Sequence, residues 1–412
     1  MMPLPIARGR ISHTVASEVG WLARAMIARL DDSNDIQLAQ EAFSSHIGRS
    51  SCTIFPLART AVWATLKELN HPVGSRVIMP PITIKPILDV VVHLGYEPVF
   101  VDIDPTTACF DHHDLQRAMA TRPSVAILTY LFGLVPDVGG IMKIFRENGV
   151  FVIEDFSQCL NGEFNGRRIG SFGDVAIYSA SSVKTFDTFG GGFALTDDPR
   201  FIKGLRRRQS ELDSPSRANL LLSIMRNLVR NLASSRLLFP VVTFWLLRLA
   251  ARMSIGGVER FTGARSTEPL AELPPAWFRR YTSLQARVAV RELPKVASRD
   301  ARRVKFVEQI VADSGVSDWT CGSHGQRHVH WQFIVYVKDF AEARKKLAKF
   351  GVDCATTSLV LLTNLPKYPG QRVAPMATRL YERGVYLPCY HQLRDGELAR
   401  IAAALRELVV VE

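Results

Sequence analysis

Three short segments between residues 150 and 196 carry side chains whose types and spacing suit chemistry. VFVIEDFSQ places Asp155 just past an apolar, strand-like run, and GDVAIYSASSVK places Ser179 and Lys184 just past the next one. TFGGGFALT then supplies three glycines that lead into a further run. A carboxylate, a hydroxyl, an amine and a glycine-rich backbone therefore follow one another at the ends of strand-like runs.

This set matches the needs of pyridoxal-phosphate (PLP) chemistry. A lysine amine forms the Schiff base, and a carboxylate keeps the pyridine nitrogen protonated, so that the ring can act as an electron sink. Hydroxyls and backbone N–H groups hold the phosphate, and glycines let the backbone come close. Taken singly, each residue has a common structural explanation as a cap, a solvated charge or a turn. Their order and spacing together favour a PLP site.

The elements that must position these residues are strands alternating with helices. The expected strands are Val77–Met79, Pro98–Val101, Val125–Leu131, Val150–Ile153 and Val175–Tyr178, with helices at 14–48, 60–69, 85–94 and 137–148. Farther along, helices are expected at 283–313, 339–350 and 393–409, with a strand at 332–337. The alternation predicts an α/β fold with a mostly parallel central sheet, whose ligands gather at the carboxyl ends of the strands.

The motifs resemble those of the DegT/StrS family of sugar aminotransferases, PLP enzymes of fold type I. Family members carry an IED-x-x-Q strand end, then G-x-x-G-x-x-GD, S-x-x-x-x-K and a glycine cluster. The matching residues are Ile153–Gln158, Gly166–Asp174, Ser179–Lys184 and Gly190–Gly192. The resemblance covers nearly the whole chain except residues 217–265.

The resemblance implies a domain plan. It predicts a large PLP-binding domain with an N-terminal helix over residues 1–216 and a smaller C-terminal α+β domain over 266–412. Between them, residues 217–265 form a basic, apolar insertion.

The resemblance also implies roles for individual residues. Lys184 is the Schiff-base lysine and the proton shuttle, and Asp155 pairs with the pyridinium nitrogen. Gln158 lies along the cofactor near its phenolic oxygen, and Ser179 binds the phosphate.

Three further cofactor-binding positions depart partly from the family pattern. Thr60 matches the threonine of the family's phosphate cradle, whereas Arg59 replaces its glycine. Ile84 stands where an aromatic residue usually stacks on the cofactor ring.

The candidate substrate-binding residues are Lys85, Arg280 and His330. Arg280 survives from the family's N-x-R pair, which reaches the neighbouring subunit's site, but Phe278 replaces the asparagine. This departure places the usual substrate in question. His328 and His330 form an HxH pair that can bind metal, but two further ligands are missing nearby, so we expect no metal site.

We therefore expect a homodimeric aminotransferase that moves an amino group from an amino acid, with glutamate as the expected donor, to a keto sugar. The expected acceptor is nucleotide-linked, in surface glycan or secondary metabolite biosynthesis. Two alternatives remain open: a lipid-linked or other membrane-associated keto acceptor, and a non-catalytic PLP-binding scaffold or regulator.

The insertion concentrates the positive charge of the chain. The formal net charge is +12, and residues 214–258 contain six arginines but no lysine or acidic residue. A helix with Leu221, Met225 and Leu228 at helical spacing precedes LLFPVVTFWLL, an apolar run too short to span a bilayer, which takes about twenty residues. A basic amphipathic helix followed by an apolar hairpin can lie on an anionic membrane surface, here through residues 217–255. The alternative is a dimer interface or a cover for the active site, and no nucleic acid is expected.

The six cysteines and the N-terminus bear on location. The cysteines are scattered without a CxxC pair, and MMPLPIARGRISH lacks the apolar core of a signal peptide. We expect a cytoplasmic protein that takes a peripheral position at the inner membrane face if the insertion binds lipid.

Overall fold

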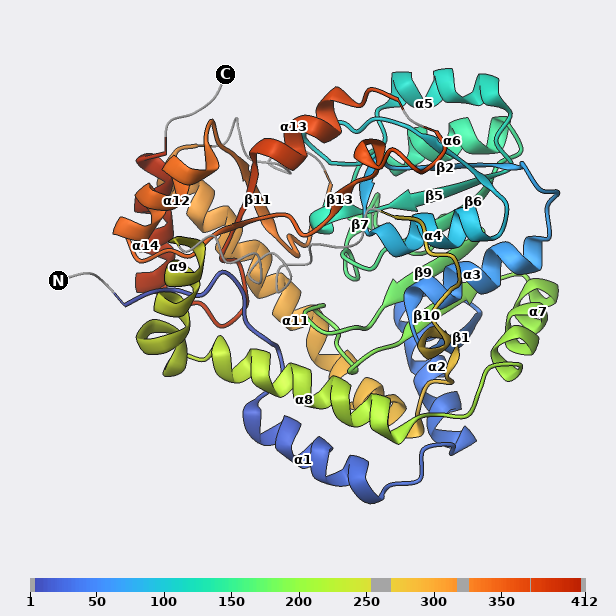
Figure 1. Cartoon of the computed structure of the whole chain (residues 1–412), viewed down its shortest axis with the longest axis horizontal. Helices are drawn as coiled ribbons and strands as arrows, with labels where there is room; N and C mark the ends of the chain where they lie inside the picture. The colour runs from blue at the N-terminus through green and yellow to red at the C-terminus, as the bar shows by residue number, and fades with distance from the viewer. Residues whose placement is uncertain (1–3, 253–267, 317–325, 371, 409–412) are drawn as a thin grey trace.

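A seven-stranded sheet forms the centre of the protein (Figure 1). The structure is a computed structural model that describes residues 4–252, 268–316, 326–370 and 372–408. The strands are β1 (Ser51–Phe55), β2 (Arg76–Met79), β4 (Glu97–Phe100), β5 (Val125–Thr129), β6 (Phe151–Asp155), β9 (Val175–Ser179) and β10 (Gly192–Thr196). Their order is β1-β10-β9-β6-β5-β2-β4, and only β10 runs antiparallel to its neighbours. The mostly parallel α/β fold expected from the sequence is confirmed.

Helices cover both faces of this sheet. They are α2 (Ser33–Ile47), α3 (Ala58–Leu69), α4 (Lys85–His93), α5 (His112–Ala118), α6 (Val138–Glu147) and α7 (Pro199–Ser210), whereas α1 (Val15–Ile27) belongs to a separate apolar cluster without residues of this sheet. Successive side chains of a strand point to opposite faces. Ile78 accordingly joins the core that contains α2 and α6, while Val77 and Met79 join the core that contains α3 and α4. Burial on both faces explains why these strands are apolar at consecutive positions.

A smaller sheet lies in the C-terminal part of the chain. Its strands are β11 (Phe333–Tyr336), β12 (Ala355–Thr356) and β14 (Gly384–Leu387), accompanied by α12 (Phe340–Lys349), α13 (Pro375–Arg383) and α14 (Asp395–Arg406). The long helix α11 (Ser283–Ser314) packs against both α2 and α14, and so joins the two parts (Figure 1). Two short antiparallel pairs complete the strands: β3 (Ile82–Thr83) with β13 (Val360–Leu361), and β7 (Glu163–Phe164) with β8 (Arg167–Arg168).

The described part of the basic, apolar segment is mostly helical, with a turn at residues 234–237. It forms α8 (Arg217–Ala233), a π-helical turn at Phe239–Thr243 and α9 (Phe244–Arg252), and α8 packs on α1. The expected apolar hairpin is therefore wrong. Pro240 falls at the start of the π-helical turn, where its missing N–H group needs no acceptor. No helix in the described part of the chain has the length and apolar character needed to cross a bilayer.

Glu154, the residue before Asp155, holds the turn that leads into β9. Its carboxylate is fully buried, and Oε1 accepts hydrogen bonds from Tyr130 Oη at 2.8 Å and Gly170 N at 2.7 Å. Oε2 accepts from Phe172 N and Gly173 N, both at 2.9 Å. Hydrogen bonds thus compensate the buried charge, and they fix β6 to the glycine segment that precedes β9.

Replacing Glu154 with alanine is expected to lower the free energy of unfolding by roughly 3 kcal/mol or more, because several buried donors lose their acceptor. Urea denaturation followed by circular dichroism measures this change. Glu147→Ala, on the exposed side of α6, is the matched control and is expected to change stability little. Equal effects of the two substitutions would contradict the role given to Glu154.

Candidate active site

The register of the sheet brings the predicted site residues to one edge. Phe55 pairs with Gly192, and Gly192 pairs with Ser179 on its other side. Asp155 ends β6, which runs parallel to β9 and beside it. The carboxyl ends of β1, β6 and β9 therefore meet at the amino end of β10, where the chain also enters α3 and the loop that carries Lys184.

The Lys184 amine is withdrawn from water. Burial lowers its pKa to about 8, although the nearby Asp155 carboxylate acts in the opposite direction. The Nζ atom lies 4.0 Å from the centroid of the Trp331 ring, within the range of a cation–π contact. Trp331 Nε1 also donates to Val183 O at 2.9 Å, and Val183 has a left-handed φ of 71°. A β-branched residue in this conformation is strained, a condition that surrounding contacts must hold in place.

Asp155 and Ser179 are connected through Ser157. Burial raises the pKa of the Asp155 carboxyl, while hydrogen bonds from Ser157 act against the rise. Ser157 N donates to Asp155 Oδ1 at 3.1 Å, and Ser157 Oγ accepts from Ser179 N at 3.0 Å. The hydroxyl oxygens of Ser179 and Ser181 are 3.1 Å apart. Three hydroxyl groups therefore gather beside a buried carboxylate at the ends of β6 and β9.

The start of α3 lies directly against the glycine run. A Cβ atom on Gly192 would lie 2.3 Å from Leu57 O and 2.6 Å from Ala58 N, so only glycine fits. Thr60 is buried, and its hydroxyl donates to Trp277 O at 2.7 Å. The Arg59 guanidinium lies over the Trp277 ring at 4.8 Å. These two side chains contact Trp277. Thr60 N and Ala61 N donate to Leu57 O, both at 3.1 Å, and the amino end of α3 carries the positive end of the helix dipole, which suits an anion.

Gln158 acts on the loop that follows β5. Its Oε1 accepts from the N–H of Phe132 at 2.6 Å, and Phe132 has a left-handed φ of 59°. At the next residue, a Cβ atom on Gly133 would lie 2.6 Å from Trp331 N and 2.8 Å from Gln158 O. The close approach of three backbone segments thus brings Trp331 from the C-terminal part of the chain to Lys184. The predicted cofactor contact of Gln158 stays a prediction.

The structure brings neither Ile84 nor Lys85 into this cluster of groups. Ile84 is partly buried at the start of α4 and packs between two apolar clusters. Lys85 is buried, with Nζ 2.8 Å and 3.0 Å from the two carboxylate oxygens of Asp89 and 5.4 Å from the Tyr368 ring centroid. Because this ion pair already satisfies the ammonium group, the geometry favours a structural role for Lys85.

His330 is also buried, and burial lowers its pKa to about 3, so the ring is neutral. Its neighbour His328 accepts a hydrogen bond from Val135 N at 2.9 Å through Nδ1. No group of three or more histidine, cysteine or acidic side chains suited to a metal ion occurs in the described residues. Of this histidine–tryptophan segment, Trp331 is the residue with a direct contact to Lys184.

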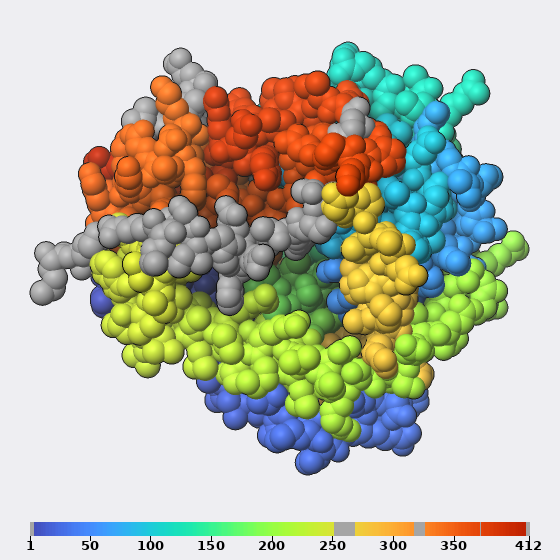
Figure 2. Space-filling view, viewed as in Figure 1, coloured from blue at the N-terminus to red at the C-terminus, as the bar shows by residue number. Residues whose placement is uncertain are grey.

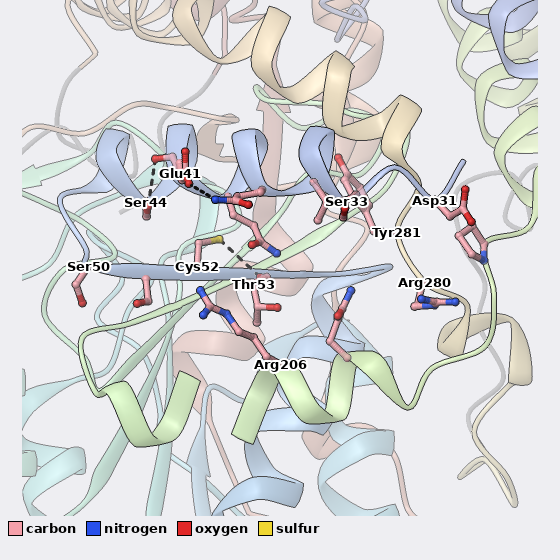
Figure 3. A pocket seen from close by; sticks show the side chains of 16 residues that line it. Asp31, Ser33, Glu41, Ser44, Ser50, Cys52, Thr53, Arg206, Arg280 and Tyr281 are labelled. Atoms are coloured by element: carbon pink, nitrogen blue, oxygen red, sulfur yellow. Dashed lines mark hydrogen bonds between the residues drawn. The ribbon is translucent and has the colours of Figure 1, made fainter. Parts of the chain in front are cut away.

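Arg280 lies in a different place, a cleft of about 570 Å³ between α2, β1 and α7 (Figure 3). The cleft is also lined by Asp31, Arg206 and Tyr281, and by none of Lys184, Asp155 or Ser179. Arg280 Nε is buried without a hydrogen-bond partner among the described residues. Arg280 and Lys184 of one chain therefore do not share this cleft.

Sequence reasoning missed the contact between α8 and the Lys184 loop. Asn227 is fully buried, accepts a hydrogen bond from Ser182 Oγ and donates through Nδ2 to Asp187 Oδ2 at 2.5 Å. Ser182 and Asp187 stand on either side of Lys184 in the chain. One turn along α8, Asn231 donates to Glu18 Oε2 at 2.9 Å. Asn227 and Asn231, four residues apart and therefore on one face of the helix, were the available signal.

The residues present fit PLP. Asp155 is a buried carboxylate suited to a protonated ring nitrogen, and Lys184 supplies an amine of lowered pKa for covalent attachment. The first turn of α3, the glycine run and the Ser179 hydroxyl offer donors for a phosphate. When bound, PLP supplies an electron sink that stabilises negative charge on a substrate carbon.

Comparisons with known proteins agree with this site. The sequence profile of the DegT/DnrJ/EryC1/StrS aminotransferase family matches residues 25–216 and 251–406, and the chain belongs to this family. It is therefore a PLP-dependent aminotransferase. The profile leaves residues 217–250 unmatched.

One relative matches along most of its length. The UDP-N-acetyl-3-dehydro-alpha-D-glucosamine 3-aminotransferase of Acidithiobacillus ferrooxidans is 25% identical over 354 residues, which are 84% of this chain and 81% of that protein. Among solved structures, the Helicobacter pylori aminotransferase of pseudaminic acid biosynthesis has a TM-score of 0.74 at 14% identity, covering 97% of this chain and 98% of that one. The Escherichia coli GDP-4-keto-6-deoxy-D-mannose-3-dehydratase with bound hydrated PLP has a TM-score of 0.72 at 15% identity, covering 98% and 100%. The two structures share the fold.

The lowered pKa of Lys184 predicts when the cofactor-free protein takes up PLP. Attachment needs the neutral amine, whose fraction rises with pH through the pKa, so the uptake rate should increase with a midpoint near pH 8. Stopped-flow absorbance of PLP added to apoprotein measures this profile. The Lys184→Ala variant should show no slow covalent phase at any pH. A midpoint near the ordinary lysine value of about 10.4 would contradict the burial of the amine.

Asn227→Ala is expected to loosen the Lys184 loop, because Ser182 and Asp187 both lose a hydrogen-bond partner. We expect kcat to fall about 10- to 100-fold with a smaller change in KM, since misplacement of a reacting group costs rate. The uptake profile of PLP should also shift in pH, an effect that lost stability alone would not produce. Asn219→Ala, on the exposed side of α8, is the control. An unchanged kcat and uptake profile in Asn227→Ala would contradict the positioning role.

Proposed function

We propose that this enzyme transfers an amino group from an amino acid, with glutamate as the expected donor, to a keto sugar. The carrying observation is the buried Lys184 amine, with its pKa lowered to about 8, beside the Asp155 carboxylate in a chain of this aminotransferase family. An amine with this pKa can both accept and release a proton near neutral pH. Lys184 therefore acts first as the base that removes the donor's Cα proton and later as the acid that returns a proton.

The acceptor we propose is a nucleotide-linked keto sugar in surface glycan or secondary metabolite biosynthesis. The relative that matches most of this chain is named as an aminotransferase of a UDP-linked 3-keto sugar, which supports this class. A second candidate is a lipid-linked keto acceptor. It is supported by α8, which contacts the Lys184 loop through Asn227 and exposes apolar residues such as Leu222 and Val229 to solvent.

We also propose that the working form is a homodimer in which each chain completes its partner's site. Arg280 supports this arrangement, because it lines the cleft of Figure 3, whose lining does not include Lys184 of its own chain. A guanidinium at the wall of a cleft is suited to a phosphate or carboxylate supplied from outside the chain. Of the other candidates, His330 is a neutral buried ring and Lys85 is paired, so Arg280 is the substrate contact we retain.

For location, we propose a cytoplasmic enzyme that associates peripherally with the inner face of the membrane. The support is the six arginines and the apolar side chains of residues 217–255. Scattered cysteines without a disulfide pattern agree with a reducing compartment.

Mass spectrometry of the products tests the transfer and the shared site together. With glutamate and a UDP-linked keto sugar, the PLP-loaded enzyme should form 2-oxoglutarate and the amino sugar, whereas Lys184→Ala and Arg280→Ala homodimers should both be inactive. Mixing the two variants after mild dissociation should restore activity, because one site in each mixed dimer has an intact Lys184 and an intact Arg280. Active Arg280→Ala homodimers, or mixed dimers without activity, would refute the shared site. Failure of the intact enzyme with every keto sugar would refute the acceptor class.

A further inference from the structure

Exposed apolar side chains are concentrated in α8, the π-helical turn and α9. Of the 21 large hydrophobic residues exposed in the described part of the chain, 11 fall between residues 222 and 249. These are Leu222, Met225, Val229, Leu232, Leu237, Leu238, Val241, Val242, Trp245, Leu246 and Leu249. α8 and α9 form the yellow-green band across one face of the molecule (Figure 2). A patch of this density marks an interaction surface.

α8 buries polar as well as apolar side chains on its inward face. Its inward face buries Asn227 and Asn231, together with Leu220 and Ile224, against the rest of the protein. Of the apolar residues that recur at helical spacing in α8, Ile224 is buried, whereas Met225 and Leu232 are exposed.

The outward stripe follows helical spacing, with Leu222, Met225, Val229 and Leu232 in register. Because this exposed stripe is apolar, it is suited to contact with a nonpolar environment. The π-helical turn and α9, which follow in the chain, expose further apolar residues, among them Val241 and Trp245.

The positive charge of the segment indicates which kind of surface binds the exposed apolar residues. The segment 217–252 contains six arginines and no aspartate, glutamate or lysine. Arg217 is engaged with the carbonyl groups of Ala25 and Ala28, and Arg236 with Glu397. Arg226 and Arg230, four residues apart, are exposed along one border of the apolar stripe of α8.

A second copy of the chain would bind poorly to the exposed apolar face of α8 and α9, because the two copies would repel each other electrostatically. Isologous pairing would bring the arginines of one copy towards those of the other, with no acidic residue in the segment to offset them. An anionic lipid surface offers phosphate groups for Arg226 and Arg230 and an acyl boundary for the stripe. Trp245 and the neighbouring leucines are suited to the interfacial zone.

We propose that α8 and α9 lie flat on an anionic phospholipid bilayer. The apolar side chains of residues 222–249 enter the boundary between headgroups and acyl chains, and Arg226 and Arg230 bind lipid phosphates. The inference rests on the proposed peripheral location and is independent of the transfer reaction. The family profile does not match residues 217–250, so the docking face is a feature of this chain beyond the matched family regions.

Vesicle flotation tests the proposal with the PLP-loaded full chain. The protein should float with vesicles that contain phosphatidylglycerol and much less with pure phosphatidylcholine. The double variant Val241→Asp/Leu246→Asp should lose flotation, and it is expected to fold because both side chains are exposed. Arg226→Gln/Arg230→Gln should weaken binding on the order of tenfold or more. Matched controls are Val73→Asp, at an exposed apolar residue outside the segment, and Lys143→Gln/Arg146→Gln on α6.

Trp245 gives a second readout, from a tryptophan on the docking face itself. The difference between the emission of wild-type protein and that of Trp245→Phe should shift to shorter wavelength when anionic vesicles are added. Absent flotation, or equal flotation of wild type and Val241→Asp/Leu246→Asp, overturns the proposal. So does loss of dimer mass in that variant without lipid binding by the wild type, which would assign the face to a second copy. The absorbance of bound PLP, measured in the same samples, separates failure of docking from failure of the enzyme.

Discussion

A lysine amine in water keeps its proton up to about pH 10, so Lys184 has to leave water before it can act as a base near neutral pH. The structure meets this condition by burying the amine near the Asp155 carboxylate and against the face of the Trp331 ring. Burial alone would lower the pKa of the amine further, and the Asp155 carboxylate offsets part of this decrease. The strand ends, the glycine run and the α3 turn all serve to hold groups around this one amine.

Holding the amine requires support from distant parts of the chain. The loop around Lys184 contains Val183 and Phe189 in left-handed conformations, which neighbouring contacts must stabilise. His13 packs on the Phe189 ring at a centroid distance of 4.8 Å and hydrogen-bonds Asp187 O at 2.9 Å. Asn227 of α8 completes the support from the other direction. A buried polar network of this kind fixes one loop geometry because each member needs its partner.

α8 presents different side chains on its two opposite faces. Asn227 faces inward and holds the loop of Lys184, whereas Leu222, Leu232, Arg226 and Arg230 face outward. Because one rigid helix carries both faces, a surface bound by α8 lies only a helix diameter, about 10 Å, from the residues that flank the catalytic lysine. A membrane-docked enzyme would receive its acceptor close to the lipid surface, an arrangement that suits both nucleotide-linked sugars of glycan synthesis and lipid-linked ones.

The sequence by itself determined the fold class and the grouping of Asp155, Ser179 and Lys184. These residues follow strands directly, and the carboxyl ends of parallel strands share one edge, so local spacing was enough. Only the tertiary structure decided that Trp331 covers Lys184, that Thr60 and Arg59 contact Trp277, and that Arg280 lies away from the lysine of its own chain. It also decided which face of α8 is buried, because the polar groups of the Lys184 loop and of α1 prefer the asparagines. These contacts depend on packing between segments that are far apart in the chain. The periodicity of one helix therefore does not predict which of its faces is buried.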